Sequence, residues 1–360
     1  MTQYTCIEID KTDLHNAEIV RSDLPELAEG EILLDIESFA LTANNITYAV
    51  VGEQMKYWNF FPASSGDNGI IPMWGHATVI ASKHGEIAEG ERVYGYLPMG
   101  SHLIVQPGKV SKSSFTDMVE HRQEMAPIYS QYQRLAADPA HHPDFESERA
   151  LFAPLFMTSF LIEDMFRRAD WHGADALVIT SASSKTGMAL AQVAKASSPQ
   201  IKRIGLTSPG NIEFTEGLGF YDEVLAYADV ETLDAGTRIV SVDFAGNGDV
   251  LKRIHTHFGD NLAFSSLVGA THVDARGGAK GLAGPAPVLF FAPTAAGDIL
   301  KELGPEGFQK AVAVRWNAFV GDVAGQVAIQ SVDGAEEVKS AYLQMLAGDV
   351  PPTNGLVCSI

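Results

Sequence analysis

The segment 176–194, ALVITSASSKTGMALAQVA, constrains the fold of this chain more than any other part of its sequence. An apolar run at 176–180 predicts a buried strand, a polar loop over 181–186 follows it, and a helix is expected to open at Gly187. Another apolar run, at 204–207, begins after this helix and completes a strand–helix–strand unit. Unpaired backbone N–H groups and the helix dipole then meet at one point, which makes a ready site for an anion. The segment therefore predicts a parallel α/β sheet that binds a phosphorylated cofactor.

Composition narrows the class of protein. The chain has 360 residues, of which 46% are hydrophobic and 19% charged, as expected for a globular protein of two domains. Its 25 basic and 45 acidic residues give a formal charge of 25 − 45 = −20, which disfavours nucleic acid and membrane surfaces as partners. Two cysteines, Cys6 and Cys358, cannot form a disulfide framework and suit a reducing compartment. Without a signal-peptide pattern or a long apolar run, we expect a cytoplasmic protein.

The first part of the chain has the pattern of a β-rich domain. Over about the first 110 residues, short apolar runs alternate with Gly, Pro and Asn breaks, which fits a closed or partly closed barrel. The expected strands are at 32–36, 77–81, 92–96 and 102–105. A polar stretch at 114–149 follows, and its spacing predicts a helix over 121–136.

Strands and helices alternate over the second part of the chain, from 176 to about 319, in the order typical of a doubly wound parallel sheet. A helix at 152–168 is expected to lead into this region. Further strands are expected at 224–226, 238–243, 262–268 and 288–292, helices at 249–257, 297–303 and 335–347, and a last strand at 356–360.

The polar loop departs from the usual dinucleotide fingerprint. Only Gly187 occupies a glycine position, whereas Ser184 and Lys185 stand where glycine normally permits close approach. Side chains can bind phosphate instead, through the charge of Lys185 and through hydroxyl donors. The hydroxyls are those of Ser181, Ser183, Ser184 and Thr186. A polar turn without a ligand is the alternative, and a P-loop is disfavoured because its two glycines are here Ile179 and Ser184.

The end of the second strand indicates which cofactor would bind. NAD sites usually place a carboxylate about 20 residues beyond the glycine loop. This chain has Thr207, Ser208 and Asn211 there, which can bond a 2′-phosphate without repelling it, so the sequence favours NADP. Later strand ends are expected to line the nicotinamide half of the cofactor. The residues at these ends are Val268, Gly269, Phe291 and Ala292.

The β-rich part holds the candidates for substrate chemistry. Asn44, Tyr48 and Tyr57 lie next to an apolar strand and can donate hydrogen bonds to a carbonyl, with either tyrosine as acid toward an enolate. Packing and turn formation are the alternative roles for these residues. His76 and His102 lie near glycine turns and are expected to be hydrogen-bonded core histidines. No CxxC or HxxxH spacing is present, so no metal site is expected.

Four runs, in order along the chain, resemble the medium-chain dehydrogenase/reductase superfamily. They are AEGEILLDIESFALTANNITYAVVG at 28–52, PMWGHATV at 72–79, GERVYG at 90–95, and the closing segment 347–357. The resemblance implies a fold with a GroES-like β-barrel catalytic domain, at 1–150 and 320–360, and a Rossmann doubly wound parallel sheet, at 151–319. It points to the zinc-free quinone and enoyl reductase-like branch, because zinc-ligand cysteines are absent from the expected stretches. Within that branch, the chain looks closest to a group with SASSKTG in place of the glycine-rich loop.

The resemblance also implies a function. A metal-free reductase of this branch would use NADPH to pass hydride to a small-molecule substrate with an activated double bond, a quinone or a carbonyl, and would form a homodimer. The alternative is a non-catalytic NADP-binding or interaction protein that retains the reductase fold.

Overall fold

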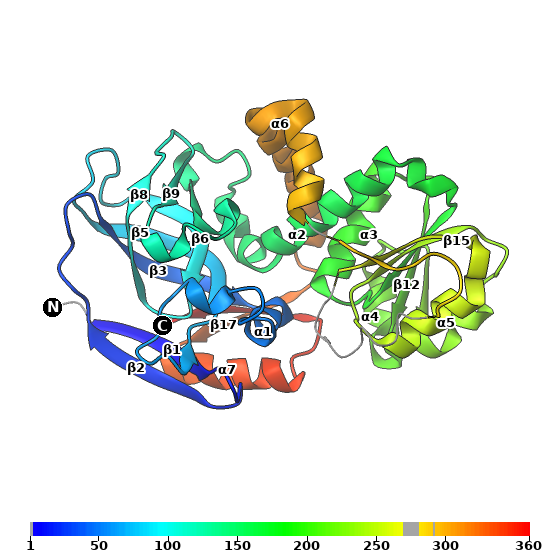
Figure 1. Cartoon of the computed structure of the whole chain (residues 1–360), viewed down its shortest axis with the longest axis horizontal. Helices are drawn as coiled ribbons and strands as arrows, with labels where there is room; N and C mark the ends of the chain where they lie inside the picture. Colours follow the sequence, from blue (N-terminus) through cyan, green and yellow to red (C-terminus); the bar gives the residue numbers. More distant parts are fainter. Residues whose placement is uncertain (1–2, 269–280, 291) are drawn as a thin grey trace. The chain divides into compact units, whose positions relative to one another are not determined.

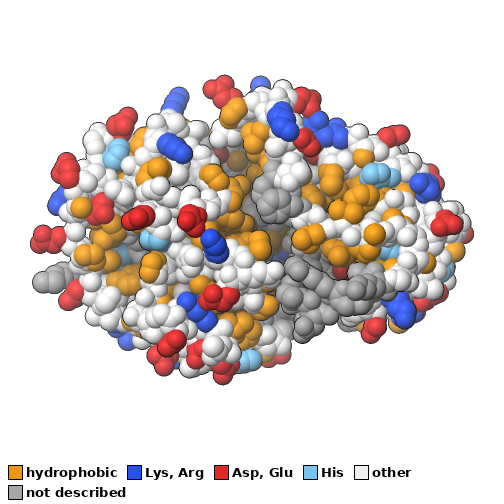
Figure 2. Space-filling model, in the orientation of Figure 1, with side chains coloured by type: hydrophobic (Ala, Val, Ile, Leu, Met, Phe, Trp, Pro, Cys, Tyr) orange, Lys and Arg blue, Asp and Glu red, His pale blue; other side chains and the backbone are white. Residues whose placement is uncertain are grey.

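The computed structural model describes residues 3–268, 281–290 and 292–360 (Figure 1). The chain divides into two compact units. The first combines Met1–Leu151 with Val327–Ile360, and the second is Phe152–Gln326. Acidic and basic side chains are interspersed on the face shown in Figure 2. None of the helices in these described ranges is long and apolar enough to cross a membrane.

The first unit is built from two sheets. The smaller sheet has the strand order β2-β1-β4, and the larger one has β17-β18-β3-β5-β6-β10-β9-β8, with β7 paired to β3. The strands of the smaller sheet are β1 (Gln3–Asp10), β2 (Ala17–Asp23) and β4 (Asn68–Gly69). Those of the larger sheet are β3 (Ile32–Leu41), β5 (Pro72–Ser82), β6 (Arg92–Pro98), β7 (His102–Val105), β8 (Pro107–Gly108), β9 (Ser114–Asp117), β10 (Gln131–Arg134), β17 (Ala328–Asp333) and β18 (Asn354–Ser359). Two helices, α1 (Ala43–Val50) and α7 (Ala335–Ala347), accompany these sheets.

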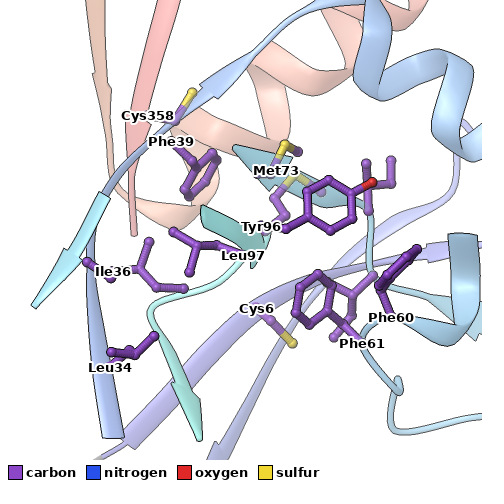
Figure 3. Close-up of a cluster of buried hydrophobic side chains, with 14 of the residues drawn as sticks. Cys6, Leu34, Ile36, Phe39, Phe60, Phe61, Met73, Tyr96, Leu97 and Cys358 are labelled. Atoms are coloured by element: carbon purple, nitrogen blue, oxygen red, sulfur yellow. The ribbon is translucent and has the colours of Figure 1, made fainter. Parts of the chain in front are cut away.

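Side chains alternate between the two faces of β5 and β6, and the hydrophobic core takes residues from both faces, since Tyr96 belongs to it as well as Leu97. Met73 and Leu97 point into the hydrophobic core beside Phe39 (Figure 3). Gly75 keeps the strands close, because a Cβ there would lie 2.1 Å from the carbonyl oxygen of Ser38. Trp74, the neighbour of Met73 on β5, and Tyr96, the neighbour of Leu97 on β6, face the other way, since successive side chains of a strand point to opposite sides.

The helix predicted over 121–136 is wrong. The segment instead forms the 3-10 helices η2 (Glu120–Arg122), η3 (Pro127–Ser130) and η4 (Leu135–Ala137), with strand β10 between the last two. Pro127 interrupts any helix, and the ring of Tyr132 stacks on Phe115 at 5.4 Å where β10 pairs with β9. Tertiary pairing therefore overrides the local helical spacing.

The second unit contains a parallel sheet with the strand order β13-β12-β11-β14-β15-β16. Its strands are β11 (Ala176–Thr180), β12 (Lys202–Thr207), β13 (Glu223–Ala226), β14 (Ile239–Asp243), β15 (Leu262–Leu267) and β16 (Val288–Leu289). Counted from β11, this is the 3-2-1-4-5-6 order of the doubly wound fold, in which ligands bind where the order reverses. The reversal lies between β11 and β14, and the loop after β11 is the one singled out above.

The helices of this unit are α3 (Lys185–Ser197), α4 (Ile212–Gly217), α5 (Gly248–Phe258) and α6 (Ala292–Val323), and α2 (Glu146–Arg168) leads into it from the first unit. Helix α3 opens at Lys185 rather than at the expected Gly187, because Ser184 is its N-cap. The strand expected at 288–292 ends at Leu289. Helix α6 is much longer than the 297–303 expected, and it continues across a kink at Gly304.

Candidate functional site

The loop between β11 and α3 is held by the cap of the helix. The side-chain oxygen of Ser184 accepts the N–H of Gly187 at 3.1 Å. Gly187 has no room for a side chain, because a Cβ would lie 2.7 Å from the backbone oxygen of Ser181. The one glycine of the loop therefore stands where two backbone segments meet closely.

Two tyrosines from later in the chain brace the same loop. Ser181 has a left-handed backbone, with φ of 49°, and its N–H donates to the hydroxyl of Tyr227 at 3.1 Å. The hydroxyl of Tyr221 donates to the carbonyl oxygen of Ala182 at 2.8 Å. A left-handed non-glycine residue costs about 1–3 kcal/mol, so such a turn persists only where its surroundings fix it. Sequence reasoning missed both tyrosines, which lie about 40 positions beyond the loop they hold.

The hydroxyl of Ser183 joins the loop to the end of β12. It accepts hydrogen bonds from Thr207 Oγ1 at 3.0 Å and from Asn211 Nδ2 at 3.2 Å. Asn211 also donates to Ser208 Oγ at 2.9 Å. A hydroxyl has two acceptor lone pairs and one hydrogen, so Ser183 keeps its hydrogen to donate elsewhere. The structure thus brings together these four residues that the sequence analysis selected separately.

Lys185 and Thr186 form the first turn of α3. Lys185 is half-buried, and burial lowers the pKa of its ammonium group to about 8. The backbone carbonyl of Thr186 accepts the hydroxyl of Ser159 from α2 at 3.0 Å, which anchors this turn. Lys185 therefore adds a positive charge to the first turn of α3, which begins two residues after Ser183.

The strand ends at the reversal point are linked to each other. Thr180 Oγ1 donates to Asp243 Oδ1 at 2.5 Å and accepts the N–H of Phe244 at 3.0 Å. Burial raises the pKa of Asp243. The N–H of Val268 donates to the carbonyl of Asp243 at 3.0 Å, which places Val268 at this edge of the sheet. Ala292 begins α6, while Gly269 and Phe291 lie outside the described residues.

In the first unit, the three candidates for substrate chemistry lie together. Asn44 Nδ2 donates to the hydroxyl of Tyr48 at 2.7 Å, one turn along α1. The rings of Tyr48 and Tyr57 are 4.6 Å apart, and Trp74 Nε1 donates to Tyr48 at 3.3 Å. The hydroxyls of Tyr57 and Tyr129 are 3.3 Å apart.

These rings form what we call the aromatic cluster, which consists of Tyr48, Tyr57, Phe60, Trp74, Tyr96 and Tyr129. Tyr96 lies near its centre, with ring centroids 4.9 Å from both Trp74 and Tyr129. Trp74, Tyr96 and Tyr129 were missed as candidates because they belong to three distant segments. The alternating aromatic residues of β5 and β6 were the one signal available in the sequence.

Tyr48 is a neutral donor in this setting. Burial raises its pKa above the ordinary value for tyrosine, and the neighbouring Tyr57 adds to that effect. Its oxygen already accepts bonds from Asn44 and Trp74, so its own hydrogen is left to donate. Burial also raises the pKa of Tyr57.

The expectation that both core histidines are hydrogen-bonded is correct for His102 and wrong for His76. His102 Nδ1 lies 2.8 Å from Ser101 Oγ. Within the part of the chain that the structure describes, neither ring nitrogen of His76 has a hydrogen-bond partner, although its side chain is buried. It lies instead beside the ring of Tyr94, at 5.2 Å.

Cys6 and Cys358 are buried in the hydrophobic core of the first unit. Burial raises the pKa of Cys6 to about 11 and that of Cys358 to about 12, so both remain thiols at neutral pH. Among the residues that the structure describes, no three His, Cys, Asp or Glu side chains gather as metal ligands would.

Comparison with known proteins identifies the fold. A family model described as "Protein of unknown function (DUF2855)" matches residues 39–351, and no curated protein sequence matches. The quinone oxidoreductase of Coxiella burnetii is 14% identical over 100% of both chains, with a TM-score of 0.59. CurA of Vibrio vulnificus, in complex with NADPH, is 18% identical over 99% of both chains, with a TM-score of 0.60. The yhdH oxidoreductase of Salmonella enterica, in complex with NADP, is 12% identical over 100% of both chains, with a TM-score of 0.54.

These likenesses extend over both units. They confirm the predicted fold class, in which a GroES-like β-barrel accompanies a Rossmann doubly wound parallel sheet. The chain therefore has the medium-chain dehydrogenase/reductase fold.

Proposed function

The chain belongs to the family described as "Protein of unknown function (DUF2855)", and we propose that it is an NADPH-dependent reductase that needs no metal ion. Its substrate would carry an activated double bond, a quinone or a carbonyl. The structures of CurA with NADPH and of the yhdH oxidoreductase with NADP support this choice of cofactor. In the proposed organisation, 151–319 binds the cofactor, while 1–150 and 320–360 bind the substrate.

The Ser183 hydroxyl is the observation that carries the proposal. Its acceptor capacity is used by Thr207 and Asn211, so it can only donate, and a phosphate oxygen is an acceptor. Lys185 adds positive charge at the N-terminus of α3, and the loop lies at the sheet edge where doubly wound folds bind ligands. In this loop, side chains would bind the phosphate, whereas a glycine-rich loop binds it with backbone N–H groups.

Selectivity for NADPH would come from the end of β12. Thr207, Ser208 and Asn211 offer hydroxyl and amide groups to a 2′-phosphate, and no carboxylate stands among them to bind a 2′-hydroxyl or repel a phosphate. We place Val268, Gly269, Phe291 and Ala292 along the nicotinamide half of the cofactor.

The aromatic cluster would hold the substrate. NADPH, when bound, supplies the hydride. The hydrogen of Tyr48 would be donated to the substrate oxygen, with Asn44 fixing the orientation of the phenol and Tyr57 covering the ring. The raised pKa of Tyr48 keeps its phenol protonated at neutral pH, so that its role would be to donate a hydrogen bond.

The raised pKa values of Tyr48 and Tyr57 also favour one alternative, a non-catalytic NADP-binding or interaction protein. Both are weak proton donors at neutral pH. Titration of the purified protein with NADPH and NADH, followed by an activity assay with a panel of quinones, enals and enones, distinguishes the reductase from the non-catalytic protein. We expect tighter binding of NADPH and its oxidation by at least one acceptor. Equally feeble binding of both cofactors would remove the cofactor assignment, and tight binding without turnover would favour the alternative.

The homodimer is likewise a proposal. Light scattering that gives the mass of a single chain would reject it.

A further inference from the structure

One face of the β5–β6 pair carries a continuous row of polar and aromatic residues. The register pairs Trp74 with Tyr96, His76 with Tyr94, and Thr78 with Arg92. Because these residues alternate with the core positions, all three pairs share one face. The first pair belongs to the aromatic cluster, and the last lies at an ion-pair network.

The middle of this row gathers buried polar atoms that have no hydrogen-bond partner among the described residues. These atoms are both ring nitrogens of His76, the hydroxyl of Tyr94, Nη1 of Arg149 and Nδ1 of His141. We call these four residues the polar cluster. The ring of His76 lies 5.2 Å from that of Tyr94, and Arg149 Cζ lies 4.4 Å above the Tyr94 ring. His76, Tyr94 and Arg149 are only 1%, 5% and 6% exposed.

Such a concentration needs an explanation. More than about 90% of buried polar groups in native proteins are hydrogen-bonded, and an orphan costs about 1–3 kcal/mol. Fold stability therefore does not account for four such side chains in one place. A molecule bound there would supply the missing hydrogen-bond partners.

The charged groups around the polar cluster are already paired, with three carboxylates against two arginines. Arg149 pairs with Asp138, while Arg92 Nη1 and Nε donate to Glu146 at 2.8 Å and Glu37 at 2.9 Å. His141 Nε2 lies 3.6 Å from Glu146.

The unpartnered atoms include several hydrogen-bond donors, namely the Tyr94 hydroxyl, Nη1 of Arg149 and one of the two ring nitrogens of His76. Burial, helped by the charge of Arg149, lowers the pKa of His76 to about 3, so its ring is neutral. A carboxylate ligand would add an uncompensated buried negative charge, which is costly. A neutral oxygen acceptor, such as a carbonyl, fits the donors without adding charge.

The polar cluster is continuous with the aromatic cluster. The rings of Trp74 and Tyr94 are stacked, with centroids 5.8 Å apart and an angle of 21° between their planes. The same Trp74 donates to Tyr48. A flat molecule resting on the aromatic cluster therefore has the Tyr94 hydroxyl as its neighbour.

We propose that the polar cluster binds a neutral carbonyl oxygen of the substrate, whose flat body rests on the aromatic cluster, so that this site selects neutral carbonyl compounds over carboxylates. The inference rests on the proposed function, since it takes the aromatic cluster as the place of the substrate. Half-buried Trp74 joins the two clusters, because it belongs to the aromatic cluster and stacks on Tyr94 of the polar cluster.

Three probes that differ in one substituent test this selectivity on the full chain. They are 2-acetylnaphthalene, 2-ethylnaphthalene and 2-naphthoate, titrated by calorimetry without NADPH. We expect the ketone to bind about tenfold tighter than the hydrocarbon, because one hydrogen bond to a buried donor contributes about that factor. The carboxylate should bind more weakly than the ketone. Equal affinity for ketone and hydrocarbon, or tightest binding of the carboxylate, would overturn the proposal.

A variant assigns the effect to the polar cluster. Tyr94→Phe keeps the ring and removes the hydroxyl, so the preference for the ketone should fall to within about threefold. Tyr342→Phe is the matched control, because the Tyr342 hydroxyl donates to Leu14 at 2.8 Å, outside both clusters. It should retain the full preference. A preference that survives in Tyr94→Phe would exclude the role of this hydroxyl.

An NADPH titration of the same protein separates the two proposals. Binding of NADPH without any ketone preference rejects the polar cluster as a carbonyl site and leaves the proposed function standing. A ketone preference without NADPH binding removes the reductase proposal and supports the carbonyl site.

Discussion

The loop after β11 and the row of residues on β5–β6 use buried polar atoms in opposite ways. In the loop, Ser183, Thr207 and Asn211 bond to one another, and Tyr227 holds the strained turn. In the row, the polar atoms of His76 and Tyr94 have no partner among the described residues. Bonded polar groups fix a conformation, whereas orphaned ones lower stability unless a partner is supplied to them. The difference between the two regions shows that hydrogen bonds among side chains hold the glycine-poor loop in shape, whereas the polar atoms on β5–β6 make no such contribution.

The largest expected effect comes from Gly187→Ala. The added Cβ would meet the Ser181 carbonyl at 2.7 Å, so the loop must shift. We expect a loss of NADPH affinity of about 100-fold and destabilisation by about 1–3 kcal/mol. Gly248→Ala is the control, because nothing lies within 4 Å of its added Cβ. Calorimetry and thermal unfolding measure both effects, and unchanged affinity would show that the loop shape does not matter.

Lys185→Met should weaken NADPH binding about 10- to 100-fold, since a hydrogen bond to a charged group contributes about 1.5–3 kcal/mol. The loss should be as large for NADP that lacks its nicotinamide, because the proposed partner of the lysine is a phosphate. A variant that binds both like the wild type would place the phosphates elsewhere.

The same lysine predicts a pH dependence. Its pKa of about 8 means that it is charged below pH 8 and loses its proton above. NADPH affinity should be constant on the acidic side of that value and fall as the pH rises through it, by up to about tenfold per unit. Bound phosphate raises the pKa, so binding above pH 8 takes up protons. Lys185→Arg stays charged and should abolish the fall; persistence of the fall in that variant would point to another group.

Tyr227→Phe should weaken NADPH binding about threefold to tenfold. It removes the acceptor of the Ser181 N–H, and one such hydrogen bond contributes about 1 kcal/mol. Tyr342→Phe provides a comparison in which a tyrosine of the other unit loses a hydroxyl that donates to the carbonyl oxygen of Leu14. An equal effect in both would mean that Tyr227 acts on general stability rather than on the loop.

The smallest effect is expected for the stability of Tyr94→Phe. Its orphaned hydroxyl contributes nothing to folding, so we expect a change within about 0.5 kcal/mol or a slight gain. Tyr132→Phe should lose about 1–3 kcal/mol, because that hydroxyl donates to Tyr96 at 2.7 Å and accepts from Arg122 at 3.1 Å. Denaturant unfolding measures both. An equal loss of unfolding free energy in both variants would mean that the Tyr94 hydroxyl contributes to folding as much as the bonded Tyr132 hydroxyl does.

Local patterns predicted much of the fold and part of the site. The apolar run before Ser181 and the capped helix after it are short-range signals, so β11, the loop and α3 could be predicted to within two residues. The polar contacts among Ser183, Thr207 and Asn211 follow from the parallel strand order.

The remaining features depend on contacts between distant segments. Tyr227, which follows β13, bonds to Ser181 in the loop, and the ring of Tyr129 contacts that of Tyr96, although each pair is far apart in sequence. The helix expected at 121–136 was wrong because pairing of β10 with its neighbours decides that segment. A buried histidine such as His76 is expected to form hydrogen bonds, and only the structure shows that its ring nitrogens have no partner among the described residues.

The affinity of Ser183→Ala for NADPH tests the central claim most directly. If the hydroxyl donates to a phosphate, calorimetry will show a loss of affinity of about tenfold or more. The free energy of unfolding should also fall, by about 1–3 kcal/mol, because Thr207 and Asn211 lose their acceptor. An affinity equal to that of the wild type would contradict the account, because the cofactor would then not touch the loop on which the assignment rests.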